Sequence, residues 1–162
     1  MVRSRWTFRR GRRLRSTPLM PLRRHWLYPV KWTGAAHDGF FLLALVADER
    51  AVRDLVPESS AILALDFSAV IATAAAEPGQ SHDFVSRLFA PKVGIPEDPV
   101  TGSSHTVLGP FWADRLGRTS LVGIQASSRP GRVGVNVLGD RVTITGRATT
   151  VLDGRLAAVA QP

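Results

Sequence analysis

The segment from residue 97 to residue 105, Glu-Asp-Pro-Val-Thr-Gly-Ser-Ser-His, combines residue types that can bind an anion and move a proton. Its proline stiffens a loop, and the loop delivers Gly102, Ser103 and Ser104 to the start of a predicted helix. The first turn of a helix has about four unpaired amide N–H groups and roughly half a positive charge. Because Gly102 has no side chain, a carboxylate or phosphate can approach these amides closely, and the Ser103 hydroxyl can add a donor.

Asp98 lies five residues before Ser103, at the rim of the same predicted pocket. A carboxylate there suits the positioning of an ammonium group or assistance in a proton transfer. A structural interpretation is also open, in which Asp98 organises its loop and Ser103 caps the helix. Arg87, on the preceding predicted strand, is expected to make a structural ion pair rather than to contact a substrate.

Three other kinds of chemistry have less support in the sequence. The chain contains no cysteine, which excludes disulfides, cysteine-ligated zinc and a thiolate nucleophile. A metal site from His82, Asp83 and His105 has no recognisable ligand spacing. A triad of Ser103, His105 and Asp98 lacks the Gly-x-Ser-x-Gly turn that exposes a nucleophilic serine. We therefore expect His105 to be a packing or surface histidine of the helix.

The elements that hold the loop follow from the hydrophobic pattern. A helix is predicted over residues 103–116, because Val107, Leu108 and Phe111 recur at three- and four-residue steps, and we expect these three to be buried. Gly117 fits its end. Strands are predicted over residues 40–46, 68–75, 83–89, 120–126, 132–138 and 141–152, a short helix over 48–55, a loop over 91–102 and a hairpin turn at Gly139-Asp140. The pattern predicts an α+β fold in which strands surround one helix.

The net charge of +8 is unevenly distributed along the 162 residues. Residues 1–40 carry nine Arg, one Lys and a single acid, Asp38, so the excess positive charge lies there and the remainder is nearly neutral. The longest apolar run, residues 40–47, has eight residues, whereas a membrane-spanning helix needs about 20. The sequence therefore predicts a soluble, cytoplasmic domain over residues 32–162 that follows an Arg-rich extension over residues 1–31.

The extension shows no helical or strand period, and three prolines interrupt it. Four interpretations stay open: a basic arm that binds nucleic-acid phosphates, an Arg-rich presequence, a solvated segment without a role, and a segment that is not a natural continuation of the domain. The first has partial support from aromatic residues that interleave with the arginines, namely Trp6, Phe8, Trp26 and Tyr28. A charged segment of this composition is expected to be disordered.

The stretch DFVSRLFAPKVGIPEDPVTGSSHTVLGPFWADRLG, together with QASSRPGRVGV and GDRVTITGRATTVLDG, resembles the PhzF-like phenazine-biosynthesis family. This family is related to diaminopimelate epimerase and proline racemase. The resemblance implies two similar domains, each a β-rich barrel-like wrap around one central helix, with the active site between the N-termini of the two helices. It covers about four-fifths of the chain, and the helix from Ser103 would be the central helix of the second, C-terminal domain.

The resemblance also implies a function. It implies a cofactor-independent isomerase that uses no metal, in a family whose members usually form homodimers. The best understood member shifts a double bond in a dihydroanthranilate-type substrate by proton transfer. Carried over residue by residue, Asp98 is the catalytic candidate, and Gly102, Ser103 and Ser104 are the substrate-binding candidates. A cysteine base occupies the place of Asp98 in the racemase relatives, so cysteine-based racemisation is excluded.

Two departures from the family qualify this prediction. The principal acid–base glutamate of the family lies in the first domain, and residues 1–31 do not match that domain. We therefore expect a C-terminal half that turns over substrate poorly alone. It would pair as a homodimer or with a complementary N-terminal domain. Pro130-Gly131 replaces the usual glycine pair after Arg129. The leading prediction is an isomerase of small carboxylate metabolites; the alternative is a non-catalytic interaction domain whose basic arm contacts nucleic acid.

Overall fold

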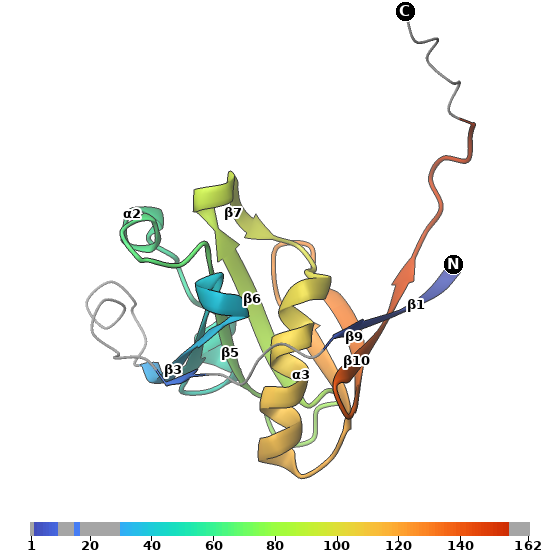
Figure 1. Cartoon of the computed structure of the whole chain (residues 1–162), viewed down its shortest axis with the longest axis horizontal. Coiled ribbons are helices and arrows are strands. Elements are labelled where there is room, and N and C mark those ends of the chain that lie inside the picture. The colour runs from blue at the N-terminus through green and yellow to red at the C-terminus, as the bar shows by residue number, and fades with distance from the viewer. Residues whose placement is uncertain (1, 10–14, 17–29, 156–162) are drawn as a thin grey trace, which may run out of the picture.

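The computed structural model describes residues 2–9, 15–16 and 30–155 of the chain, which form one curved sheet with three helices (Figure 1). The strands are β1 (Val2–Arg9), β2 (Arg15–Ser16), β3 (Val30–Ala36), β4 (Phe41–Val46), β5 (Ala69–Ala75), β6 (Phe84–Ala90), β7 (Ile95–Asp98), β8 (Ser120–Gln125), β9 (Gly131–Leu138) and β10 (Arg141–Ala148). The helices are α1 (Glu49–Arg53), α2 (Ser59–Leu63) and α3 (Gly102–Leu116), with 3₁₀ turns η2 (His37–Gly39) and η3 (Pro91–Val93).

The order of the strands explains why helices lie on both faces of the sheet. The sheet runs β1-β10-β9-β8-β6-β5-β4-β3-β2, with β7 added beside β6. Two adjacent pairs are parallel, β4 with β5 and β6 with β8, whereas β5 and β6 are antiparallel. The two crossovers therefore step in the same direction along the sheet between strands of opposite direction. Since crossovers share one hand, the first, through α1 and α2, and the second, through α3, must cover opposite faces.

Helix α3 is the centre of the larger core. Every residue from Ser104 to Ala113 is buried, so the helix has no solvent-facing side over these turns. Its apolar side chains pack against residues from β4, β5, β6, β8, β9 and β10. The predicted burial of Val107, Leu108 and Phe111 is confirmed. The helix begins at Gly102 and ends at Leu116, and the next residue, Gly117, adopts the left-handed conformation with φ of 65°.

The opposite face of the sheet carries α1 and α2 and a second apolar core. Strand β4 is buried along nearly its whole length because alternate residues face the two cores, Leu43 toward α3 and Leu42 and Ala44 toward α1. The carboxylate of Asp48 accepts a hydrogen bond of 2.7 Å from the amide of Ala51. From its place before the short apolar helix over residues 48–55, Asp48 is also the residue that the sequence predicts as N-cap, and the structure confirms it.

The α+β class is confirmed, but the expected barrel-like closure is not observed. Among the described residues, the edge strands β1 and β2 are the two ends of the sheet and do not pair with each other. The sheet therefore curves around α3 and stays open. In the part of the chain that the structure describes, no helix is long and apolar enough to cross a membrane.

Several boundaries differ from the sequence prediction. The expected loop over residues 91–102 contains η3 and β7, and β10 ends at Ala148 rather than at residue 152. Strand β3 and helix α2 were not predicted. The Gly139-Asp140 turn is confirmed as the hairpin between β9 and β10, with φ of 56° at Gly139.

The Arg-rich extension contributes to the sheet where the structure describes it. Residues Val2–Arg9 form β1, which pairs antiparallel with the whole length of β10, and β2 pairs with β3. The sequence showed no strand period here, because pairing with a strand about 140 residues away leaves no local pattern. Val30 and Lys31 begin β3, and residues 1, 10–14 and 17–29 of the extension, including Trp26 and Tyr28, lie outside the described residues. The domain boundary near residue 31 stays a prediction.

Candidate functional site

The candidate site is built around the turn between β7 and α3. Asp98 is the last residue of β7 and pairs with Leu88 of β6, which fixes its position against the central sheet. Three residues later, the Thr101 hydroxyl donates a hydrogen bond to the Asp98 carboxylate. Asp98 therefore does organise its loop, as the structural interpretation expected, and the residue is half-buried rather than enclosed.

Gln125, at the end of β8, binds the same turn through three side-chain hydrogen bonds. Its side-chain oxygen accepts a hydrogen bond of 2.9 Å from the Thr101 amide. Its side-chain nitrogen donates to the Asp98 carbonyl at 2.7 Å and to the Thr101 hydroxyl at 3.1 Å. Gln125 is 1% exposed, so this buried amide is satisfied only while the turn keeps its shape. We did not nominate Gln125 from the sequence, although it opens the QASSR stretch that supports the resemblance.

The start of α3 has no side-chain cap. Thr101 occupies the N-cap position, but its side chain makes no capping hydrogen bond, because it contacts Asp98 and Gln125 instead. Gly102 and Ser103 are exposed, and a Cβ atom built on Gly102 would meet nothing within 4 Å. The first residues of the helix are thus exposed, with free space beside Gly102. Ser103 lies inside the helix and is not its N-cap.

Ser104, the third substrate-binding candidate, differs from its neighbours. Its side chain is buried, and its hydroxyl donates to the Thr101 carbonyl at 2.9 Å. Any contribution of Ser104 to ligand binding must therefore come from its backbone amide, as expected from the sequence, and not from its hydroxyl.

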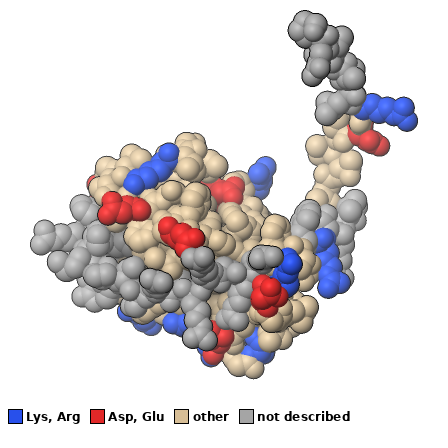
Figure 2. Space-filling view, viewed as in Figure 1, with Lys and Arg blue, Asp and Glu red and all other residues tan. Residues whose placement is uncertain are grey.

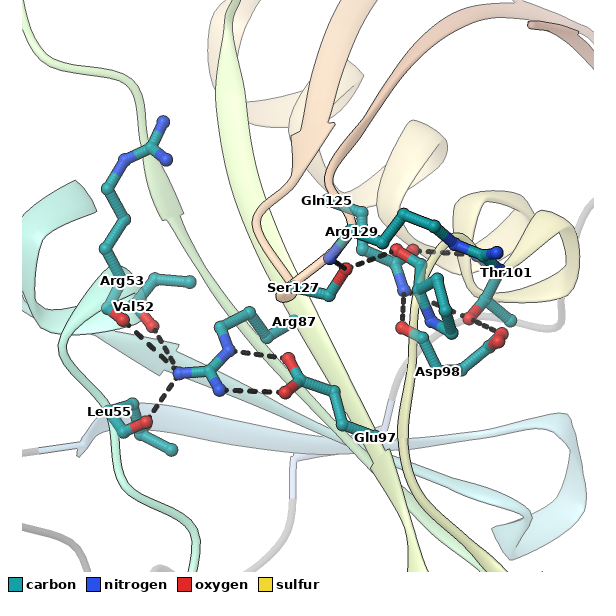
Figure 3. Close-up of polar contacts among 11 residues, drawn as sticks. Val52, Arg53, Leu55, Arg87, Glu97, Asp98, Thr101, Gln125, Ser127 and Arg129 are labelled. Carbon is teal, nitrogen blue, oxygen red and sulfur yellow. Dashed lines mark hydrogen bonds and ion pairs between the residues drawn. The ribbon is translucent and has the colours of Figure 1, made fainter. Parts of the chain in front are cut away.

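An arginine clamp fixes the strand that carries Asp98. Arg87 of β6 makes a two-point ion pair with Glu97, at 2.7 Å and 3.0 Å. The same guanidinium donates to carbonyl oxygens at the end of α1 (Figure 3), those of Val52, Arg53 and Leu55. The predicted structural ion pair of Arg87 is confirmed, and it connects α1, β6 and β7 directly beside Asp98.

The loop after β8 supports the site from the other side (Figure 3). The Ser127 hydroxyl donates to the Pro99 carbonyl at 2.9 Å and accepts from the Arg129 amide at 3.2 Å. A Cβ atom on Gly131 would lie 2.4 Å from a methyl carbon of Val100. A larger residue in place of Gly131 would therefore displace the Val100 side chain, whereas Pro130-Gly131 keeps a glycine at this contact.

His105 is a packing histidine with no exposed surface. Its Nδ1 lies 2.7 Å from the Thr101 carbonyl oxygen, and a carbonyl only accepts, so Nδ1 carries the hydrogen. Burial lowers the pKa of His105 from 6.5 to about 4, against the raising effect of this hydrogen bond. The imidazole is therefore neutral at physiological pH.

The residues considered for a metal site do not converge. His82 bonds to the Glu49 carboxylate at 3.0 Å, on the α1 side of the sheet. Asp83 pairs with Arg118 and accepts from the Val122 amide at 2.7 Å. His105 lies in the α3 core. Across residues 2–9, 15–16 and 30–155, no cluster of three or more such ligands is present.

Solved structures with this fold are found among phenazine-biosynthesis proteins. A PhzF-family protein from Enterococcus faecalis superposes with a TM-score of 0.81 at 35% sequence identity, covering 89% of this chain and 54% of that chain. A PhzC/PhzF protein from Clostridium difficile, described as putative, gives a TM-score of 0.80 at 29% identity, covering 96% of this chain and 58% of that chain.

Curated proteins give the same relationship. An uncharacterized isomerase of Pseudomonas aeruginosa is 45% identical over 114 residues, 70% of this chain and 43% of that protein. The human phenazine biosynthesis-like domain-containing protein is 47% identical over 93 residues, 55% of this chain and 32% of that protein. The chain thus spans about half the length of these relatives, or less. Residues 11–154 match the family described as phenazine biosynthesis-like protein, and the chain belongs to this PhzC-PhzF family.

Proposed function

We propose that this domain forms one wall of an isomerase site, in which the start of α3 binds a small carboxylate and Asp98 takes part in proton transfer. The observation that carries the proposal is the uncapped helix start beside Asp98. Thr101, the residue that could cap α3, uses its hydroxyl to hold Asp98. The amides of Gly102 and Ser103 can then donate hydrogen bonds to an anionic group.

A carboxylate fits this helix start better than a neutral group does. Exposed amide N–H groups at a helix start lie at its positive end and donate to negative oxygens. The open space in front of Gly102 allows an oxygen to approach the backbone, and the Ser103 hydroxyl adds a donor from the same turn. The carboxylate of Asp98 then lies at the edge of the bound ligand, where it can accept from an amino group or exchange a proton with it.

Proton transfer to carbon also needs a group on the opposite side of the ligand, within about 3 Å of the reacting atom. We propose that this group belongs to a separate domain that packs against the wall formed here, as the resemblance implies. The pair would move a proton from one carbon of the substrate to another without a change in oxidation state, so no cofactor is needed. On this proposal the functional unit is cytoplasmic and is a homodimer or a pair of complementary domains.

Binding can be measured on the chain itself with three ring compounds, each one group different from the next. Anthranilate carries a carboxylate and an amino group, benzoate carries only the carboxylate, and benzamide has a neutral amide in place of the carboxylate. In an NMR titration we expect the first two to shift the amide resonances of Gly102 and Ser103, and benzamide to have no effect. Asp98→Asn should remove the preference for anthranilate over benzoate, about tenfold for a hydrogen bond to a charged group.

Asp140→Asn is the matched control, because it is the same substitution at a position away from the site. Asp140 lies in the β9–β10 turn, and Gly131, near the site, is at the opposite end of β9. Equal binding of benzamide, or shifts that avoid the start of α3, would contradict the carboxylate site.

Turnover can be followed as solvent deuterium incorporation into a dihydroanthranilate-type substrate, with and without a separately expressed first domain of a close relative. We expect efficient exchange only in the mixture, and Asp98→Asn should lower it by about 10²–10⁴-fold. If this chain alone exchanges deuterium and Asp98→Asn abolishes the exchange, Asp98 is sufficient for proton transfer without the first domain. No exchange in either case would contradict the proposal.

The alternative function, a module that contacts nucleic acid through its basic arm, predicts DNA retention that falls steeply with salt and disappears without residues 1–31. Outside the arm, basic and acidic side chains of the described residues lie interspersed on the face seen in Figure 2. This distribution gives the described part of the domain no surface of a single sign there, so we favour the isomerase proposal.

A further inference from the structure

Three buried polar side chains form a row across the centre of the sheet, on the face that packs against α3. Ser86 of β6 is paired with Thr73 of β5 on one side and with Gln125 of β8 on the other. Along β6, Ser86 lies between Phe84 and Leu88, and both belong to the core around α3. Since residues two apart share a face of a strand, the row lies beneath the helix.

The outer two members of the row have complete hydrogen bonding. The Thr73 hydroxyl accepts from the Trp112 indole at 3.0 Å and donates to the Val85 carbonyl at 2.7 Å. Gln125 holds the Thr101 turn, as described above. The middle member, Ser86, has a buried hydroxyl with no partner among the described residues.

The other buried side-chain atom without a partner in the described part of the chain is Nε2 of His105. The His105 ring lies above the same strand, with its centroid 6.0 Å from that of Phe84, two residues from Ser86. Because Nδ1 carries the hydrogen that binds the Thr101 carbonyl, Nε2 has a free lone pair and can only accept.

We propose that an internal water molecule joins the Ser86 hydroxyl to Nε2 of His105, and that His105 is thereby a positioning residue for the amides at the start of α3. Buried polar atoms in folded proteins are almost always paired, and an internal water that binds otherwise unsatisfied groups is the common solution. The water donates to Nε2 and exchanges a second hydrogen bond with Ser86. The role of His105 in ligand binding rests on the function proposed above, whereas the water bridge does not.

The link from His105 to the ligand passes through one peptide group. The carbonyl of Thr101 and the amide of Gly102 belong to the same planar unit, and in a trans peptide they point in opposite directions. His105 Nδ1 and the Ser104 hydroxyl both hold this carbonyl toward the core. The Gly102 N–H is therefore directed outward, toward the open space where the carboxylate is proposed to bind.

Two measurements on the full chain test the water bridge without any ligand. Nitrogen-15 NMR should show His105 as the Nδ1–H tautomer at neutral pH, with Nε2 accepting a hydrogen bond; the Nε2–H tautomer would overturn the proposal. Ser86→Ala should lower the folding equilibrium constant about fivefold, the worth of an average hydrogen bond. If the hydroxyl were unsatisfied, its removal would leave stability unchanged or increase it, and that result would overturn the bridge.

The positioning role is tested by two substitutions of His105 with anthranilate as the probe. His105→Asn keeps a donor near the position of Nδ1 and should bind anthranilate within about twofold of the wild type, whereas His105→Phe loses the donor and should bind about fivefold more weakly. Equal affinities of the two variants would overturn the positioning role. Failure of the wild type to bind anthranilate would instead contradict the proposed function, and the tautomer and Ser86→Ala would still decide the water bridge.

Discussion

Helices α1 and α3 begin in opposite ways, although each follows a strand of the same sheet. At α1, Asp48 caps the helix through the Ala51 amide. At α3, Thr101 stands at the equivalent position, and its side chain turns away toward Asp98 and Gln125. The first arrangement closes a helix end with a local side chain. The second leaves the helix end without a side-chain cap, because the residue at the cap position donates its hydroxyl hydrogen to a nearby carboxylate.

The two helices also differ in how they are packed. α3 is buried on all sides from Ser104 to Ala113, whereas the α1–α2 layer covers the sheet on one side only and leaves Leu63 half exposed. An open end on a helix whose body is held by the core costs the fold little, because packing rather than capping keeps α3 in place. A five-residue helix such as α1 buries only three residues, so it depends more on its cap.

The largest expected effect concerns packing. Leu108→Ala should lower the free energy of unfolding by about 2–5 kcal/mol, because Leu108 is fully buried at the centre of the α3 core. Leu63→Ala, in the outer layer, should cost well under half of that, since Leu63 is 50% exposed. Urea unfolding followed by circular dichroism measures both. Similar losses for the two variants would contradict the difference between the layers.

The second effect is the pH dependence of stability at the two helices. The folded pKa of His105 is about 4 against 6.5 for an ordinary histidine, so the unfolded chain binds the proton first. Stability due to neutral His105 is complete above about pH 6.5 and is lost as the pH falls toward 4, by about 3 kcal/mol in total. Unfolding of His105→Asn across this range should show a correspondingly smaller slope.

Glu49 of α1 affects stability over a different pH range. Burial alone would raise the pKa of its carboxyl, but hydrogen bonds from Arg53, the Glu77 amide and His82 outweigh burial and lower it. Its contribution to stability is therefore present above the usual value of 4.5 and is lost only as the pH falls further. Glu49→Gln should flatten the stability curve below pH 4.5 and leave the His105 window unchanged.

The smallest expected effects compare the two helix starts directly. Asp48→Ala should destabilise the domain by about 1 kcal/mol through the loss of the α1 cap. Ser103→Ala should change stability by less than about 0.5 kcal/mol, because Ser103 is exposed and caps nothing. The same substitution should weaken anthranilate binding, which NMR titration measures. A loss of stability at Ser103 equal to that at Asp48 would mean that Ser103 has a structural role.

Features with a local signal were predicted well. The burial of Leu108 follows from helical periodicity, the cap at Asp48 from its place before a short apolar helix, and the β9–β10 turn from Gly139-Asp140. The place of Gly102 at the start of α3 was also visible, because proline, glycine and serine mark the start of a helix. Each of these features depends on residues within a few positions of one another.

Tertiary contacts decided the rest. The sequence determined that an acidic loop leads into the start of a helix, but only the fold turned the Thr101 side chain away from capping and brought Gln125 against it from 24 residues away. Strands β1 and β7 carry no clear period because their partners in β10 and β6 define them. His105 looked like an ordinary helix residue, and its burial follows from the sheet that curves around α3. Local patterns record local geometry, whereas pairing and burial depend on which distant segments the folded chain brings together.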